Sequence, residues 1–226
     1  MILNSIVPWG RELSEYVDMF NLTDDELKKS KILGCGDGPA SFNAEVTALG
    51  GSVVSIDPTY QFSTEQIAGR IDEVALEVMA EVRKKQEDFV WKNIANPDAL
   101  YEMRMSAMQT FLVDFKSGKE EGRYKYEMLP KLSFNDAQFD LALSSHFLFL
   151  YSEHLDEEFH IKAIDEMLRV AREVRIFPLV TLSGEVSTHL VPVVAHLEAR
   201  GYNCEVVKTA YEFQKGGDEM LVVTSH

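Results

Sequence analysis

The residues with the most evident chemical use are three glycines and one acid. Gly34, Gly36 and Gly38 alternate with other residues, and Asp57 follows them about twenty positions later. Glycine carries no Cβ atom, so a ligand can approach its backbone closely. A carboxylate at this spacing can accept hydrogen bonds from the hydroxyls of a ribose. The pattern therefore predicts a site for a ligand that contains a nucleoside.

A second group of chemically active residues is the segment Ser144-Ser145-His146. Imidazole titrates near neutral pH, so His146 is a candidate general base. The alternative is a structural role, in which the ring hydrogen-bonds its own loop or shapes a pocket. His146, His154 and His160 lack the i, i+4 spacing of metal ligands on one helix, so no metal site is predicted.

The elements that must position the glycines and the acid follow from the pattern around them. A short apolar run ends at Leu33, residues 40–49 have a helical pattern, and residues 52–56 are β-branched. Gly50 and Gly51 end the helix between the two strands. This strand–loop–helix–strand unit places both the glycine loop and Asp57 at the carboxyl edge of a parallel sheet.

The remaining pattern completes an α/β fold. Further strands are predicted at residues 124–129, 139–145, 173–180, 204–209 and 220–224, with helices at 157–171 and 187–200. The last two strands flank a turn and predict a hairpin. We expect a doubly wound, mainly parallel sheet of seven strands with an antiparallel terminal strand, in one domain over residues 1–226.

Two helical regions lie outside this repeating pattern. Residues 1–30 predict N-terminal helices that cover the site, with Trp9, Arg11 and Tyr16 as candidate pocket residues. Residues 62–120 predict a helical insertion between the second and third strands, longer than the single helix that a crossover needs. Asn96 and Pro97 mark the start of its second helix.

Two known nucleotide-binding motifs do not match this loop, and a third pattern does. The dinucleotide fingerprint requires a small residue where this chain has Pro39, and the G-K-[ST] of a phosphate-binding loop is absent. The sequence G-x-G-x-G, with an acid after the second strand, instead resembles the class I S-adenosylmethionine (SAM) methyltransferases. The resemblance implies that Gly34, Cys35, Gly36 and Gly38 lie under the methionine part of SAM. It also implies that Asp57 and the adjoining Pro58 meet the ribose.

The resemblance extends to a second segment and departs from the family at one position. Phe134, Asp136, Phe139 and Asp140 match a segment that the family carries before its fourth strand. The resemblance also implies that Met128 and Leu129, with Glu127, face the adenine and that Ser144 lies near the cofactor. The family often has an acid two residues before the first glycine. Ile32 stands there in this chain, and Asp37 is not a clean substitute.

The function that this resemblance implies is methyl transfer from SAM to a small-molecule or protein acceptor. Two alternatives stay open. One is a non-catalytic module that binds SAM or a nucleoside and acts through a protein partner, since a fold does not determine an activity. The other is an NAD-linked oxidoreductase, which Pro39 disfavours. The sequence names neither the acceptor nor the atom that receives the methyl group.

The composition of the chain limits the kinds of partner that it is expected to bind. The chain has 226 residues and a formal charge of −15 at pH 7. This charge disfavours nucleic acid as a partner, because binding to its phosphates needs a basic face. No signal pattern and no membrane-spanning apolar run are present, so we expect a cytoplasmic protein without a membrane partner. Two cysteines indicate no disulfide framework, and nothing indicates an oligomeric state.

Overall fold

Seven strands form one mixed sheet in the computed structural model, which describes residues 7–225. The strands are β1 (Lys31–Cys35), β2 (Ser52–Ile56), β3 (Tyr124–Lys125), β4 (Phe139–Ser145), β5 (Ala171–Phe177), β6 (Tyr202–Lys208) and β7 (Glu219–Ser225). Their order across the sheet is β3-β2-β1-β4-β5-β7-β6. β7 runs antiparallel to both of its neighbours, and the other pairs are parallel. The predicted mainly parallel sheet and its terminal hairpin are confirmed.

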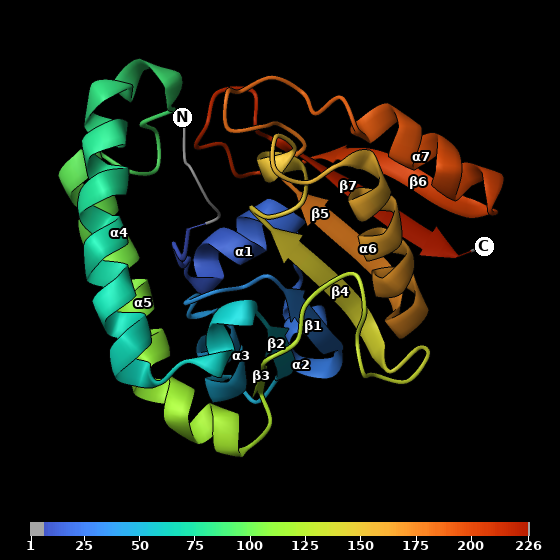
Figure 1. The fold of residues 1–226 in the computed structure, drawn as a ribbon, viewed down its shortest axis with the longest axis horizontal. Coiled ribbons are helices and arrows are strands. Elements are labelled where there is room, and N and C mark those ends of the chain that lie inside the picture. Colours follow the sequence, from blue (N-terminus) through green and yellow to red (C-terminus); the bar gives the residue numbers. More distant parts are fainter. Residues whose placement is uncertain (1–6, 226) are drawn as a thin grey trace.

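Helices cover both faces of this sheet (Figure 1). The helices are α1 (Leu13–Phe20), α2 (Asp24–Lys29), α3 (Phe42–Ala48), α4 (Thr64–Lys84), α5 (Pro97–Glu120), α6 (Glu157–Val170) and α7 (Leu190–Ala199). α1, α2 and α3 pack on one face, and α6 and α7 pack on the other. Within residues 7–225, none of the helices is long and apolar enough to cross a membrane.

Successive side chains of the central strands point alternately into two separate hydrophobic cores. Leu33 and Cys35 of β1 belong to the core beneath α6 and α7, whereas Ile32 belongs to the core beneath α1 and α3. In β4, Ala142 faces the first core and Leu143 the second. Successive side chains of a strand point to opposite faces, so these apolar runs are buried on both sides.

The helical insertion is a hairpin of α4 and α5 that stands beside the β3 edge of the sheet (Figure 1). α4 begins at Ser63 with a capping box, and α5 begins with the Asn96 cap and Pro97 that the sequence predicts. An aromatic cluster joins the hairpin to the sheet. The ring of Phe111 lies 5.3 Å from the ring of Tyr124 and 5.9 Å from that of Tyr60.

Several predicted boundaries are wrong. The third strand covers only Tyr124–Lys125, because the Glu127 N–H bonds back to the Lys125 carbonyl and turns the chain away from β2. The sixth strand covers Tyr202–Lys208 rather than residues 204–209. β5 is shifted toward the N-terminus and ends at Phe177, because the following Pro178 has no N–H to donate to a neighbouring strand.

Candidate functional site

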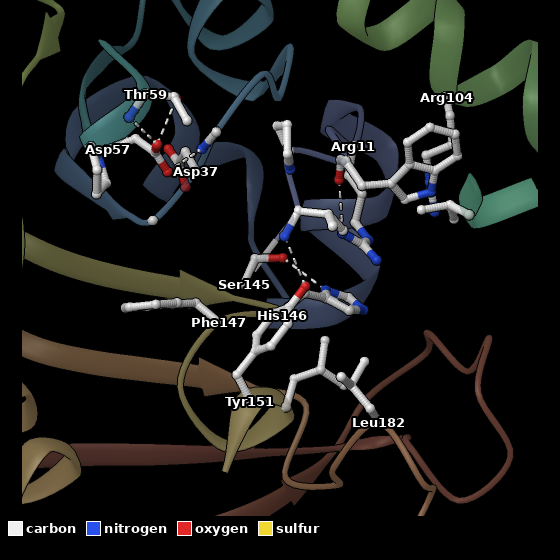
Figure 2. A pocket seen from close by; sticks show the side chains of 18 of the residues that line it. Arg11, Asp37, Asp57, Thr59, Arg104, Ser145, His146, Phe147, Tyr151 and Leu182 are labelled. Carbon is white, nitrogen blue, oxygen red and sulfur yellow. Dashed lines mark hydrogen bonds between the residues drawn. The ribbon is translucent and has the colours of Figure 1, made fainter. Parts of the chain in front are cut away.

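A cavity of about 460 Å³ opens at the carboxyl ends of β1, β2 and β4. Ligands of open α/β sheets bind at this edge. Its walls come from the loops after these strands, from the segment before α1, and from the α4–α5 hairpin (Figure 2). The volume is in the range of small-ligand sites, roughly 300–1,000 Å³.

The glycine loop after β1 is held against β2 by a hydrogen bond of 2.9 Å from the Gly36 N–H to the Ile56 carbonyl. Gly36 and Gly38 line the cavity and have φ angles of 73° and 52°. Glycine adopts this left-handed region without the strain that a Cβ would cause. Gly34 has a different function, because a Cβ there would lie 1.8 Å from Asp37 Oδ2. Its missing side chain makes room for the Asp37 carboxylate.

Asp57 ties the glycine loop to the end of β2. Its Oδ2 accepts a hydrogen bond of 2.9 Å from the Gly38 N–H. Its Oδ1 accepts bonds of 2.7 and 2.6 Å from the N–H and the hydroxyl of Thr59. Burial raises the pKa of Asp57, and these hydrogen bonds oppose that rise. A carboxylate has about four acceptor positions, so about one remains for a ligand hydroxyl.

Asp37 is a second buried acid at this end of the cavity. Its carboxylate accepts hydrogen bonds from the hydroxyls of Tyr16, at 3.0 Å, and Ser55, at 2.6 Å. Burial, and to a smaller extent the charge of Asp57, raise the pKa of Asp37 to about 6, against the effect of these bonds. We call Asp37 and Asp57 the acidic end of the cavity. Near neutral pH this end is negative.

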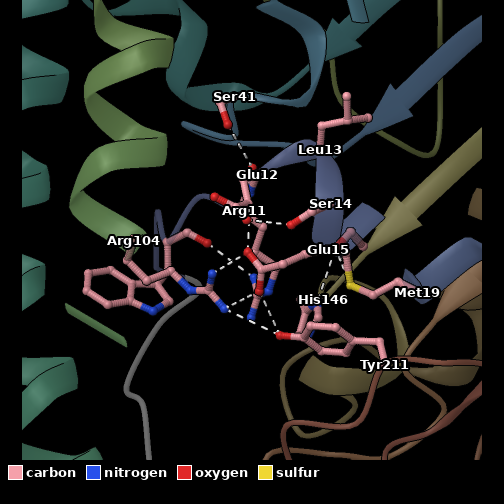
Figure 3. A network of polar contacts seen from close by, with 12 residues as sticks. Arg11, Glu12, Leu13, Ser14, Glu15, Met19, Ser41, Arg104, His146 and Tyr211 are labelled. Atoms are coloured by element: carbon pink, nitrogen blue, oxygen red, sulfur yellow. Dashed lines mark hydrogen bonds and ion pairs between the residues drawn. The ribbon is translucent and has the colours of Figure 1, made fainter. Parts of the chain in front are cut away.

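The other end is built around Arg104 of α5, which is only 1% exposed (Figure 3). Its guanidinium forms a two-pronged ion pair with Glu15 of α1, with 2.7 Å between Nη2 and Oε1. The Tyr211 hydroxyl donates to the same Glu15 oxygen at 2.9 Å. Burial raises the pKa of Glu15, but the charge and hydrogen bonds of Arg104 outweigh it and lower the pKa overall. Glu15 is therefore ionised at neutral pH.

Arg11 and His146 complete this second end, and their side chains lie together in Figures 2 and 3. Arg11 Nη1 donates to the Trp9 carbonyl at 3.2 Å, while Arg11 Nε is buried without a hydrogen-bond partner among the described residues. Burial, with the charges of Arg11 and Arg104, holds the pKa of His146 well below its usual value. We call Arg11, Glu15, Arg104 and His146 the basic end.

Seven of the ten residues predicted for the site line the cavity. They are Gly36, Gly38, Asp57, Pro58, Met128, Leu129 and His146. Gly34, Cys35 and Ser144 do not, so direct contact with a ligand is not supported for these three. Gly34 is covered by the Asp37 carboxylate, Cys35 points into the core beneath α6, and Ser144 is wholly buried in β4.

The structure adds residues that the sequence pattern did not identify. Asp37 lines the cavity although no role was predicted for it, and its place among three glycines was the available signal. Glu15 and Tyr211 carry no local motif. The candidates Trp9, Arg11 and Tyr16 all line the cavity. The residues that the structure describes contain no group of three or more side chains arranged to hold a metal ion.

Comparison with known proteins places the chain in a family. No protein-family model matches it. The uncharacterized protein MJ0045 of Methanocaldococcus jannaschii is 36% identical over 222 residues, which are 98% of this chain and 97% of that protein. The chain belongs to the MJ0045 family. Identity over nearly the full length of both proteins extends this fold to the family.

Solved structures relate the MJ0045 family to a known fold. The mitomycin 7-O-methyltransferase MmcR aligns with 95% of this chain and 54% of its own length, at 11% identity and a TM-score of 0.51. The magnesium protoporphyrin IX methyltransferase of Synechocystis PCC 6803, solved with bound SAM, aligns with 90% of this chain and 73% of its own at 13% identity and a TM-score of 0.48. The MJ0045 family has the fold of class I SAM-dependent methyltransferases.

Proposed function

We propose that this chain is a methyltransferase that uses SAM and acts on a small-molecule or protein acceptor. The observation that carries the proposal is the position of Gly36, Gly38 and Asp57 at one end of a cavity whose other end holds a separate polar group set. Methyl transfer needs a donor and an acceptor in one enclosed space, with the nucleophile in line with the methyl group. A cavity with two chemically different ends suits that requirement.

The acidic end has groups that suit the cofactor. Asp57 retains about one acceptor position for a ribose hydroxyl. Met128 and Leu129 offer apolar surface to an adenine ring. Asp37 carries a negative charge beside the glycine loop and suits the ammonium group of the methionine part. In this proposal Asp37 supplies the charge that Ile32, at the position where the family often has an acid, does not.

At the basic end, His146 is the residue suited to accept a proton. The donor, when bound, supplies a methyl group that is already activated on a sulfonium. Ser145 Oγ donates to Met19 Sδ at 3.7 Å and lies 3.0 Å from His146 Nδ1. In the tautomer in which Nδ1–H donates to Ser145, Nε2 is left as an acceptor, and this is the form that the proposal requires. The lowered pKa keeps the ring neutral at pH 7, which leaves a ring nitrogen free to accept a proton but makes it a weak base.

Ligand binding followed by methyl transfer tests the proposal. S-adenosylhomocysteine and SAM should raise the melting temperature and bind in calorimetry, because a ligand specific for the folded state stabilises it. NAD at the same concentration should not. The protein is then incubated with methyl-labelled SAM and a cell extract, divided into small-molecule and protein fractions.

Each outcome of that experiment has a distinct meaning. Label in either fraction, lost when His146 is replaced by Ala, supports an enzyme in which His146 acts on the acceptor. Binding of SAM without any transfer indicates the non-catalytic module. Stabilisation by NAD alone contradicts the assignment of Gly36, Gly38 and Asp57 to SAM.

A further inference from the structure

The basic end carries more positive charge than its own acid can balance. Arg11 and Arg104 are both guanidinium groups, and Glu15 pairs with Arg104. Burial, together with repulsion from Arg104, lowers the pKa of Arg11. An arginine nevertheless stays protonated at neutral pH. The Arg11 side chain is half-buried and lines the cavity, and a partly desolvated charge there favours a ligand that brings a negative charge.

Other ionisable groups near Arg11 do not supply that charge. His146 is neutral, and burial followed by the charge of Glu15 raises the pKa of Tyr211 to about 12, so its hydroxyl keeps its proton. Asp88 lines the cavity but is exposed, and water screens its charge. The first six residues of the sequence, MILNSI, contain no acid. Among the described residues of the basic end, two positive charges therefore face one negative charge, that of Glu15.

Arg11 also has a hydrogen-bond donor without an acceptor. Its Nε is enclosed and has no partner among the residues that the structure describes, as is also the case for Arg104 Nε, so a ligand in the cavity would meet the terminal nitrogens of Arg11. A guanidinium presents its N–H groups in a planar fork that matches a carboxylate. Charge and geometry therefore indicate the same kind of ligand group.

The walls around Arg11 are apolar. Trp9, Leu182 and Phe213 pack in one hydrophobic cluster with Val78 and Val82 of α4. All five line the cavity, and Phe213 stacks on Phe89 with 4.7 Å between ring centroids. An acceptor that fits these walls has an apolar or aromatic body, with its charged group at Arg11.

We propose that the methyl acceptor is a small apolar or aromatic molecule that carries a carboxylate, and that Arg11 binds this carboxylate. The acceptor role rests on the proposed methyltransferase function, whereas the anion site rests on the cavity alone. A carboxylate brings one negative charge, which neutralises the one unbalanced positive charge. A phosphate monoester brings nearly two at neutral pH and would leave the site negative.

The test measures binding of three matched fluorinated probes to the full chain by ¹⁹F NMR titration. The probes are 4-fluorophenylacetate, its neutral amide and 4-fluorobenzylphosphonate, each with and without saturating S-adenosylhomocysteine. We expect the carboxylate to bind about tenfold tighter than the amide, the range of one charge-assisted hydrogen bond. We also expect it to bind more tightly than the phosphonate.

Arg11→Gln should remove the preference for the carboxylate over the amide, and Arg11→Lys should retain part of it. The matched control is Arg70→Gln, which removes an exposed arginine of α4 that pairs with Glu73 outside the cavity. This control should leave all three affinities unchanged. Circular dichroism and the melting temperature of each variant show whether it is folded.

The outcomes separate this inference from the proposed function. Equal binding of carboxylate and amide, absence of carboxylate binding, or an unchanged preference in folded Arg11→Gln overturns the anion site. Tighter binding of the phosphonate overturns the choice of carboxylate. If S-adenosylhomocysteine fails to bind while the carboxylate preference persists, the methyltransferase proposal is wrong but the anion site stands.

Discussion

The two ends of the cavity bury charge of opposite sign. At the acidic end, the carboxylates of Asp37 and Asp57 are held by hydroxyl and backbone N–H donors, without an ion pair among the described residues. At the basic end, Arg104 is held by the carboxylate of Glu15, and Arg11 adds a second positive charge. A charge held by neutral donors keeps its capacity to attract a counter-ion. Each end is therefore suited to a ligand group of opposite charge.

One helix connects the two ends. Glu15 and Tyr16 are consecutive residues of α1, and Glu15 bonds Arg104 while Tyr16 donates to Asp37. A small movement of α1 would thus affect both ends at once. The following predictions test whether the ends differ in the way described, in order of decreasing expected effect.

Arg104→Ala should cause the largest loss of stability. It leaves the buried Glu15 carboxylate without its partner, and breaking a buried ion pair in this way costs about 3–5 kcal/mol. The free energy of unfolding, measured by urea titration at pH 7, should fall by that amount. The control Arg70→Ala breaks an exposed pair with Glu73 and should change it by less than about 1 kcal/mol. An equal loss of unfolding free energy in the two variants would show that the buried ion pair contributes no more to stability than the exposed one.

Asp37→Asn should change the pH dependence of stability. The Asp37 carboxyl ionises near pH 6 when folded, against 3.8 ordinarily, so the folded state binds more protons between these values. Wild-type stability from this group is therefore highest below pH 4 and is lost as pH rises through 6. Asp37→Asn removes that loss. The difference in unfolding free energy between variant and wild type should shift by up to about 3 kcal/mol from pH 4 to pH 7.

The measurement is urea unfolding of both proteins at closely spaced pH values. The same experiment with S-adenosylhomocysteine extends the comparison. If Asp37 binds the ligand's ammonium group, wild-type affinity should weaken as pH falls through 6, and the affinity of Asp37→Asn should not. A pH-independent stability difference would contradict the raised pKa of Asp37.

The glycine loop and Asp57 were predictable because they are close in sequence, whereas the role of Asp37 at the acidic end was not. Gly36, Gly38 and Asp57 lie in one βαβ unit, and glycine spacing with a following acid is a local signal. The sheet was predictable for a similar reason, since apolar strands alternate with amphipathic helices. The residues at which the strands end were harder to predict. At Glu127 a single backbone hydrogen bond turns the chain out of β3, and no residue pattern marks that bond.

The basic end could not be predicted as a whole. Its members are far apart in the sequence, and so is Tyr211, which bonds to one of them: Arg11, Glu15, Arg104 and His146 extend from the N-terminal segment to the loop after β4, and Tyr211 lies in the last hairpin. Only the packing of the α4–α5 hairpin against the sheet edge brings Arg104 to Glu15. In the sequence, Arg104 lies four residues from both Leu100 and Met108, on the apolar face of α5, so helical spacing indicates its burial but not its partner. Its pairing with Glu15, 89 residues earlier in the chain, is a tertiary property, and no local rule supplies it.

Asp57→Ala should weaken binding of S-adenosylhomocysteine without affecting the basic end. Loss of a hydrogen bond to a charged group costs about 1.5–3 kcal/mol, which is about a 10- to 150-fold rise in Kd. Calorimetry at pH 7.5 measures this change. Asp98→Ala, at an exposed acid of α5, is the control and should bind normally. A Kd within about twofold of wild type would exclude Asp57 from ribose binding.

Tyr16→Phe should have the smallest effect, and it tests the connection between the ends. The change removes the hydroxyl that donates to Asp37 at 3.0 Å and should cost about 1 kcal/mol. Because that bond favours the ionised carboxylate, its loss should raise the pKa of Asp37 further. The pH at which stability falls in wild type should therefore move upward. The carboxylate preference at Arg11 should stay as in wild type, since Glu15 and Arg104 keep their contacts. A simultaneous loss of that preference would mean that the two ends act as one site.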